Sequence, residues 1–185
     1  MTCPGIVLTG GASRRMGTDK ARIVWRGETL AARAARVLAN VCDRVVEAGP
    51  GLTGLPCVRE DPPGAGPLAA LLAATAALGT AGPVVLLACD MPFVDEPVLR
   101  LLADRDGDAT VIPVAEGRLQ LACARYGPGA ITRARDARSR GEAALRAAVS
   151  SDHEVLAEEQ WRAAGGPDVF ADLDTPGDLA RLGLS

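Results

Sequence analysis

The sequence has almost none of the residues that histidine-dependent catalysis or nucleic-acid recognition requires. Its only histidine, His153, lies in the polar stretch SSDHEV, so we expect a surface position and exclude Ser-His and Cys-His mechanisms. Aromatic residues make up 3% of the chain and the formal net charge is -3. The composition therefore provides no basic field for a nucleic-acid backbone or an anionic membrane.

One local group of arginines departs from this acidic balance: Arg133, Arg135, Arg138 and Arg140. Acidic residues flank the group, and aromatic side chains that would stack on bases are scarce, so a nucleic-acid-binding face is not expected. Two interpretations stay open. The arginines are solvated loop charges, or they contact a phosphate of a substrate.

Cysteine pairs and long apolar runs are also missing. The five cysteines are widely spaced and include no CxxC pair. We therefore expect them to be buried like apolar side chains, in a protein of the reducing cytosol, and we expect no zinc site. The longest apolar stretch, near Leu68 to Leu78, is too short to cross about 30 Å of hydrocarbon. We expect a cytoplasmic protein that forms one domain over residues 1–185.

What the sequence does contain is an alternation of short apolar strands and helices. Because the strands are apolar on both faces, the pattern predicts a mostly parallel sheet between helices, an α/β fold of three layers. The predicted strands are Ile6–Leu8, Val45–Val46, a segment around Val58, Val84–Leu87, Thr110–Val114 and Leu119–Arg125, and the predicted helices are 28–42, Leu68–Leu78 and Val98–Ala103. A capping box at Ser139 and Glu142 predicts a helix that opens at Ser139, and Thr175-Pro176 predicts a short C-terminal helix.

A glycine-rich segment, LTGGASRRMGTDK, follows the first strand. Glycines let backbone N–H groups approach phosphate oxygens, while Arg14, Arg15 and Lys20 can neutralise phosphate charge. The segment matches neither GxxxxGK[ST] nor GxGxxG. It therefore predicts an anion site of another class.

Asp90 is the second candidate, because it ends the apolar strand of PVVLLACDMP. The carboxyl end of a buried parallel strand is where open α/β sheets bind ligands. A carboxylate beside phosphates suits Mg²⁺, so Asp90 is a predicted metal ligand. The alternative is a turn or helix-capping aspartate.

Two further segments carry weaker signals. Asp172 and Asp174 would face the same side of an extended chain, so one could complete the metal site while the other caps the next helix. Asp61 precedes a glycine-containing turn and a helix start, which could contact a ribose, base or acceptor. A plain strand-to-helix connection explains that second segment equally well.

Three segments in this order resemble the MobA-like NTP transferases: LTGGASRRMGTDK, EDPPGAGPL with LACDMPFV, and FADLDTPGDL. The resemblance implies a Rossmann-like nucleotidyltransferase fold that binds Mg²⁺ and transfers GMP from GTP to molybdopterin. The paired Gly10 and Gly11 resemble the guanine-selecting form of the family. Molybdoenzymes or cofactor-insertion proteins would be the further partners.

The resemblance also assigns roles to residues. It places the nucleotide on Leu8, Thr9, Gly10 and Gly11, with Arg15 and Lys20 on the phosphates, Asp61 as a further contact and Asp90 on the metal. The sequence departs from the family where Glu47, a further predicted nucleotide contact, stands in place of a frequent asparagine, and where Asp172 and Asp174 replace an asparagine pair. An acid at position 47 repels phosphate unless it meets the base edge or a cation.

The implied reaction is an in-line attack by the acceptor's terminal phosphate on the α-phosphorus of the nucleoside triphosphate. Such a phosphate has its second pKa near 6 and needs no strong general base. Catalysis then rests on charge stabilisation by Arg15, Lys20 and the metal on Asp90. The alternatives are a guanylyl- or cytidylyltransferase for another acceptor, such as a sugar phosphate, polyol phosphate or phospholactate, and a non-catalytic GTP-binding adaptor.

Overall fold

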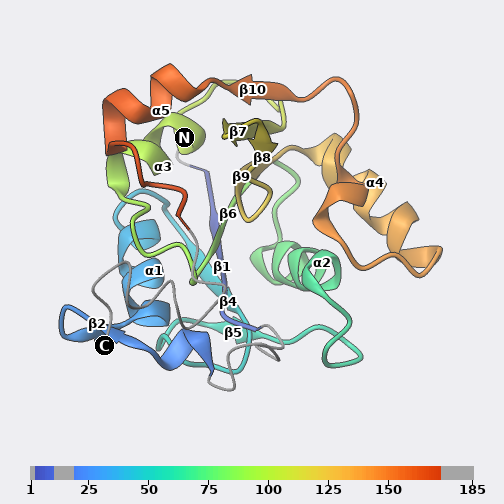
Figure 1. The fold of residues 1–185 in the computed structure, drawn as a ribbon. Helices are drawn as coiled ribbons and strands as arrows, with labels where there is room; N and C mark the ends of the chain where they lie inside the picture. Colours follow the sequence, from blue (N-terminus) through green and yellow to red (C-terminus); the bar gives the residue numbers. More distant parts are fainter. Residues whose placement is uncertain (1–2, 11–18, 172–185) are drawn as a thin grey trace.

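The computed structural model describes residues 3–10 and 19–171. Its main sheet has the strand order β10-β7-β9-β6-β1-β4-β5, with β8 paired to β7 (Figure 1). The strands are β1 (Gly5–Leu8), β4 (Val45–Ala48), β5 (Cys57–Val58), β6 (Val84–Ala88), β7 (Val111–Ala115), β8 (Arg118–Leu119), β9 (Cys123–Tyr126) and β10 (Glu154–Leu156). A separate hairpin joins β2 (Val24–Trp25) and β3 (Glu28–Thr29).

Most strand pairs of the main sheet are parallel, as the sequence predicts. β1 lies in the middle, parallel to β4 on one side and to β6 on the other. The exceptions are β9, which runs antiparallel between β6 and β7, and β8, which pairs antiparallel with β7. The start of β9 therefore lies at the edge of the sheet where β6 and β7 end.

Helices cover both faces, which confirms the three-layer fold. The helices are α1 (Leu30–Ala39), α2 (Pro67–Leu78), α3 (Glu96–Ala103), α4 (Pro128–Ser139) and α5 (Glu158–Gly165), with 3-10 turns η1 (Lys20–Arg22) and η2 (Leu145–Ala148). Figure 1 shows the sheet close to edge-on, with α1, α3 and α5 on its left and α2 and α4 on its right.

The two cores follow from the two-residue period of the strands. Val7, Val85 and Leu87 pack with α1, α3 and α5, whereas Ile6 and Leu86, one position away, pack with α2 and α4. All five side chains have 0–1% of their surface exposed. Burial of each such side chain contributes about 1.5–3 kcal/mol, so strands apolar on both faces fix the sheet between its helices.

Local signals explain where the helices begin and end. Thr29 caps α1 by accepting a hydrogen bond from the Ala32 N–H at 3.2 Å. α2 begins at Pro67, whose ring presets a helical φ, and Gly79 ends it in the left-handed region at φ 60°. Helix α1 is thus shorter at both ends than the predicted helix 28–42. At its start, residues 28 and 29 form β3 and the cap.

The prediction of a helix opening at Ser139 is wrong, because Ser139 is the last residue of α4. The helix begins instead at Pro128 and stops before Gly141, whose φ of 85° cannot continue it. The Ser139 hydroxyl donates back to the Asp136 carbonyl rather than capping a new helix. The helix predicted from Thr175 lies outside the described residues.

The structure also corrects the predictions for one strand and one cysteine. The segment predicted as one strand, Leu119–Arg125, divides into β8 and β9, because residues 120–122 form a turn between them. Cys57 is exposed on the edge strand β5, while the other four cysteines are buried as expected, and all five are free. No helix within the described residues is long and apolar enough to span a membrane.

Candidate active site

A cavity of about 320 Å³ opens where β1 and β6 end. Because parallel strands direct their carboxyl ends to the same edge of the sheet, the residues that follow β1 and β6 meet there. The cavity is lined by Leu8, Thr9, Gly10, Asp19, Lys20, Ala21, Pro67, Ala88, Cys89, Asp90, Ala122 and Leu145. Five predicted site residues are thus brought together: Leu8, Thr9, Gly10, Lys20 and Asp90.

The charged centre of this cavity is the pair formed by Lys20 and Asp90. Lys20 Nζ lies 3.5 Å from Asp90 Oδ2, and the two side chains are 14% and 30% exposed. The ammonium and the carboxylate therefore face each other while the carboxylate stays open to solvent. A cationic and an anionic group side by side can hold a phosphate and a phosphate-bound metal, respectively.

Asp90 reaches this position because β6 ends two residues earlier. The Cys89 N–H donates to the Leu8 carbonyl at 3.0 Å, which extends the β1–β6 ladder to the residue before Asp90. Burial and the neighbouring Asp90 carboxylate raise the pKa of the Cys89 thiol to about 12. Cys89 is therefore protonated at neutral pH, and the cavity wall offers no thiolate nucleophile there.

Lys20 begins η1, which Asp19 caps from the preceding position. The Ala21 N–H donates to Asp19 Oδ1 at 3.2 Å, and the Arg22 N–H donates to the Asp19 carbonyl. The Asp19 carboxylate also pairs with the exposed Arg22 at 3.3 Å. This cap fixes the turn and leaves Lys20, rather than Arg22, directed into the cavity.

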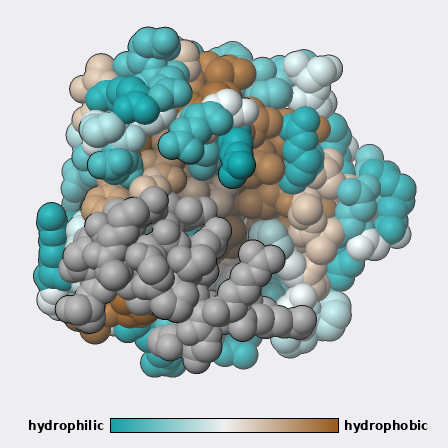
Figure 2. All heavy atoms as spheres, viewed as in Figure 1, coloured by the Kyte–Doolittle hydropathy of each residue, from teal (hydrophilic) through white to brown (hydrophobic). Residues whose placement is uncertain are grey.

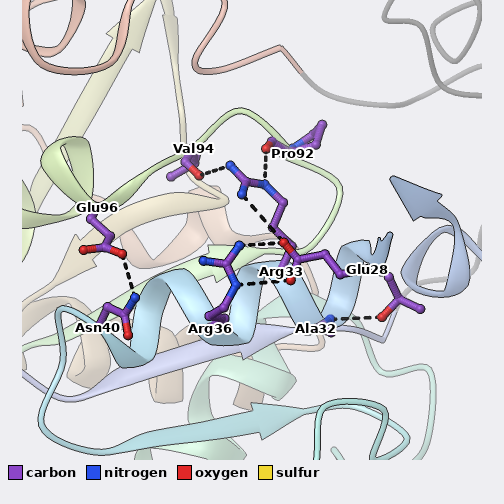
Figure 3. Close-up of polar contacts among 9 residues, drawn as sticks. Glu28, Ala32, Arg33, Arg36, Asn40, Pro92, Val94 and Glu96 are labelled. Atoms are coloured by element: carbon purple, nitrogen blue, oxygen red, sulfur yellow. Dashed lines mark hydrogen bonds and ion pairs between the residues drawn. The ribbon is translucent and has the colours of Figure 1, made fainter. Parts of the chain in front are cut away.

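Arg33 of α1 ties the turn after Asp90 to the chain after Lys20 through contacts with Pro92, Val94 and Trp25. Its Nε donates to the Pro92 carbonyl at 2.5 Å and its Nη2 to the Val94 carbonyl at 3.4 Å (Figure 3). The same guanidinium lies over the Trp25 ring, 5.0 Å from its centroid. Sequence reasoning missed Arg33, because its partners lie about 60 positions away and no local motif marks it.

An aromatic contact strengthens this link. The Trp25 ring of β2 meets the Phe93 ring edge-on, with centroids 5.1 Å apart. The Leu30 N–H in turn donates to the Ile23 carbonyl, which joins the hairpin to the start of α1. The segments that carry Lys20 and Asp90 are therefore held together outside the cavity as well as inside it.

Glu47, the acid that replaces the frequent asparagine, is fully buried at the end of β4. Its carboxylate accepts hydrogen bonds from the Thr9 hydroxyl at 2.5 Å and the Thr53 hydroxyl at 2.7 Å. The N–H groups of residues 51, 52 and 53 donate to it as well, at 2.8–2.9 Å. In this arrangement its oxygens are enclosed by protein, so direct contact with a nucleotide is not open to Glu47.

The helix start after β5 contributes less than the sequence suggests. Pro67 lines the cavity, but it has no N–H, and the Leu68 N–H already donates to the Ala143 carbonyl at 3.0 Å. Asp61 is exposed and is not among the cavity-lining residues. Its contact with a nucleotide stays a prediction.

Four predicted site residues lie outside the described residues: Gly11, Arg15, Asp172 and Asp174. Within residues 3–10 and 19–171, no group of three or more histidine, cysteine, aspartate or glutamate side chains could hold a metal. The open Asp90 carboxylate nevertheless fits Mg²⁺, which proteins bind through one or two carboxylates together with phosphate oxygens and water. Asp90 can thus supply one ligand to a metal that arrives bound to a nucleotide.

A second, larger cavity of about 590 Å³ lies beside the first, between the β7–β8 hairpin and α5. Gln120 lines this cavity and Ala122 lines the first, so residues 120–122 separate the two. The Ala122 carbonyl accepts from the Ala88 N–H and the Gln120 N–H donates to the Pro113 carbonyl, both at 2.8 Å. Arg118 and Arg162 supply positive charge to the second cavity, and Glu116 and Asp168 supply negative charge.

The arginines of the 133–140 group lie on or directly after α4, on the opposite side of the sheet from α5. Arg133 donates to the Ala148 carbonyl, and Arg140 pairs with Glu142 at 3.5 Å. Figure 2 shows hydrophilic side chains where α4 forms the right-hand side of the molecule. This geometry favours solvated charges over contacts to a substrate phosphate.

Known proteins resemble the chain in sequence and in fold. A probable molybdenum cofactor guanylyltransferase of Opitutus terrae is 38% identical over 178 residues, which cover 86% of this chain and 88% of that protein. The molybdopterin-guanine dinucleotide biosynthesis protein A of Archaeoglobus fulgidus superposes with a TM-score of 0.81 at 22% identity, covering 96% and 95% of the two chains. The Mycobacterium tuberculosis protein Rv0371C, solved in complex with manganese, superposes with a TM-score of 0.62 at 16% identity, covering 89% of this chain and 98% of that one.

The model of the MobA-like NTP transferase domain matches residues 5–155, a range that contains β1, β6, Lys20 and Asp90. The sheet order, the cavity at the ends of β1 and β6, and the sequence matches agree with one another. The chain belongs to the MobA-like NTP transferase family.

Proposed function

We propose that the protein transfers GMP from GTP to the terminal phosphate of molybdopterin and releases pyrophosphate, with Mg²⁺ as its metal. The observation that carries the proposal is the Lys20–Asp90 pair in the cavity at the ends of β1 and β6. The name of the Opitutus terrae relative, at 38% identity, supports the choice of nucleotide and acceptor. A cytoplasmic location follows from this proposal as a prediction.

In the proposed reaction an oxygen of the acceptor phosphate bonds to the α-phosphorus of GTP. The bond from that phosphorus to the oxygen bridging the β-phosphorus breaks, and the electron pair leaves with pyrophosphate. The acceptor phosphate is largely dianionic at neutral pH, so it needs no general base from the protein. The protein's task is to position the two substrates and to offset the negative charge.

The residues divide this task between them. Lys20 would support the triphosphate with its ammonium group, and Asp90, 3.5 Å from it, would hold the metal. A bound Mg²⁺ would neutralise charge on the phosphates as a Lewis acid. Gly10 leads the chain from β1 into the glycine-rich segment, where Gly11 and Arg15 are expected to contact the nucleotide. Asp172 or Asp174 would be the second metal ligand.

The second cavity is the proposed place for the acceptor. Its wall includes Arg118, an exposed arginine whose charge suits a phosphorylated ligand, together with the acids Glu116 and Asp168. Within the described residues, the segment 120–122 borders both this cavity and the one that holds Asp90. The two substrates would therefore approach each other along one edge of the sheet.

The proposal is tested by pyrophosphate release from GTP, CTP, ATP and UTP with Mg²⁺, each with and without molybdopterin. Release from GTP alone, and only with molybdopterin present, is the expected result. Release with CTP would assign the cytidylyl reaction, and release with a sugar or polyol phosphate in place of molybdopterin would assign another acceptor. GTP binding without release, with every acceptor tried, would identify a non-catalytic adaptor.

A further inference from the structure

Residues 120–122, which connect β8 to β9, border both cavities. Gln120 lines the second cavity, and Ala122 lines the first. At one end of the segment, the Gln120 N–H donates to the Pro113 carbonyl of β7 at 2.8 Å. At the other end, the Ala122 carbonyl accepts from the Ala88 N–H of β6, also at 2.8 Å. Main-chain hydrogen bonds therefore fix both ends of the segment to the sheet.

The middle of the segment is held by a buried tyrosine of β9. The Tyr126 hydroxyl donates to the Leu121 carbonyl at 2.7 Å, and the Tyr126 side chain has no exposed surface. Burial raises the pKa of this hydroxyl, so it stays protonated at neutral pH and remains a donor. Tyr126 belongs to the core between the sheet and the helices α2 and α4, and the Leu121 side chain packs against the same core. The hydrogen bond thus joins the middle of the segment to the interior of the protein.

The segment depends on this hydroxyl for its position. Without it, the Leu121 carbonyl would lose its protein partner, and the turn would have to move to bring the carbonyl to water. Because the two neighbours of Leu121 are the wall residues Gln120 and Ala122, such a movement would shift the walls of both cavities at once. A displacement of about 1 Å at a reaction site can cost roughly 10²-fold in rate.

We propose that Tyr126 is a positioning residue of the transfer reaction, whose hydroxyl acts through the Leu121 carbonyl to hold the segment 120–122 where it aligns the two substrates. This inference rests on the proposed function, in which the nucleotide occupies the first cavity and the phosphorylated acceptor the second. Tyr126 is fully buried and lines neither cavity, so it would contact neither substrate. Its effect is therefore expected on the rate of the reaction and not on the affinity for the nucleotide.

A second buried hydroxyl on the same side of the sheet provides a matched control. The Thr75 hydroxyl of α2 donates to the Leu71 carbonyl at 2.8 Å, and Thr75 is buried and lines neither cavity. Tyr126→Phe and Thr75→Val each remove one buried hydroxyl and nearly keep the shape of the side chain. Because Thr75→Val leaves the bonds of residues 120–122 in place, the two variants separate a loss of positioning from a general loss of stability.

The test combines steady-state kinetics, calorimetry and amide hydrogen exchange on the wild type and the two variants. We expect Tyr126→Phe to lower the kcat of pyrophosphate release from GTP with molybdopterin roughly tenfold, and to keep the dissociation constant of GTP alone within about twofold. The N–H groups of Gln120 and Cys123 should exchange faster in Tyr126→Phe, because the turn opens more often. Thr75→Val should match the wild type in kcat, in GTP affinity and at these two amides.

Each part of the test has a result that overturns the inference. An unchanged kcat in Tyr126→Phe, beside an active wild type, would refute the inference and leave the proposed function standing. A GTP affinity that fell as far as kcat would mean that Tyr126 shapes the nucleotide cavity instead, and unchanged exchange at Gln120 and Cys123 would mean that the hydroxyl does not hold the segment.

An equal loss of kcat in Thr75→Val would assign the effect to weaker packing on this side of the sheet, which also overturns the inference. If the wild type bound GTP but released no pyrophosphate with any acceptor, the proposed function would fail, and the role of Tyr126 in the reaction would fail with it. The wild-type assay therefore distinguishes failure of the function from failure of the inference.

Discussion

Two carboxylates stand at the ends of strands that flank β1, in opposite environments. Asp90, after β6, is 30% exposed and faces the Lys20 ammonium at 3.5 Å. Glu47, at the end of β4, is fully buried and is held by neutral donors alone among the described residues. The Asp90 side chain is accessible to a ligand, whereas the Glu47 carboxylate is enclosed by protein. The same functional group is therefore accessible on one side of β1, where the proposed reaction uses it, and part of the folded framework on the other.

The largest expected effect is that of a substitution at Asp90. Asp90→Asn should lower the turnover of pyrophosphate release by roughly 10²-fold or more, because a neutral amide loses the electrostatic attraction to the metal. The melting temperature should change little, since the side chain is partly exposed. Asp106→Asn, an exposed aspartate outside both cavities, is the control. Full activity in Asp90→Asn would remove Asp90 from the site.

Lys20, the partner of Asp90, can be compared with Arg22 in the same turn. Lys20→Ala should lower turnover by roughly 10²-fold, because it removes the cation that the cavity directs at the phosphates. Arg22→Ala, two residues along η1 and exposed, should stay within about twofold of the wild type. Steady-state kinetics with GTP checks both variants. Equal losses in the two would show that η1 acts only by its fold.

At Glu47 the comparison predicts an effect on stability rather than on chemistry. Burial alone would raise the folded-state pKa of this carboxyl group, but the hydrogen bonds from Thr9, Leu52 and Thr53 outweigh burial and lower the pKa to about 2, below the ordinary 4.5. Its contribution is therefore complete above pH 4.5 and is lost as the pH falls toward 2. The total is about 3 kcal/mol, of which about 2 kcal/mol should disappear between pH 5 and pH 3. Urea unfolding of the wild type and Glu47→Gln at both pH values measures it. Parallel pH profiles would contradict the prediction.

The smallest expected effect is that of a substitution at Arg33, which lies outside the cavity. Arg33→Met should lower turnover by roughly tenfold, because the turn after Asp90 loses its two hydrogen bonds to α1. Arg36→Met, one turn along the helix, removes an exposed pair with Glu28 and should leave activity unchanged. Steady-state kinetics and melting temperatures of both variants separate the two effects. A loss of stability in Arg33→Met without a loss of turnover would show a purely structural link.

Much of this contrast can be predicted from the sequence, and the part that cannot be predicted depends on tertiary structure. The apolar runs that end at Leu8 and Ala88 predict buried parallel strands, and parallel strands bring Lys20 and Asp90 to one edge. The sequence could not show that the Glu47 carboxylate would meet donors from residues 51–53, because that depends on how the turn after β4 folds back. Hydrogen-bonding partners of a buried charge are a tertiary property.

Other misses have the same origin. Ser139 and Glu142 fit a capping box, yet Pro128 starts α4 eleven residues earlier and the helix is already complete at Ser139. Arg33 reads as an outward-facing arginine of an amphipathic helix, while its true partners are carbonyls of the turn at 92–94. Short motifs report what a segment can do locally. They do not report which distant backbone groups will use the same side chain.

The reversed direction of β9 has a consequence for how such an enzyme can change its substrate. Within the described residues, those up to α3 build most of the first cavity, whereas the wall of the second comes from β7, β8, α5 and the segment that follows α5, and residues 120–122 border both. Substitutions in that later wall leave the Lys20–Asp90 pair in place. If the proposed function holds, the acceptor-binding wall could therefore change while the nucleotide-binding cavity stays the same.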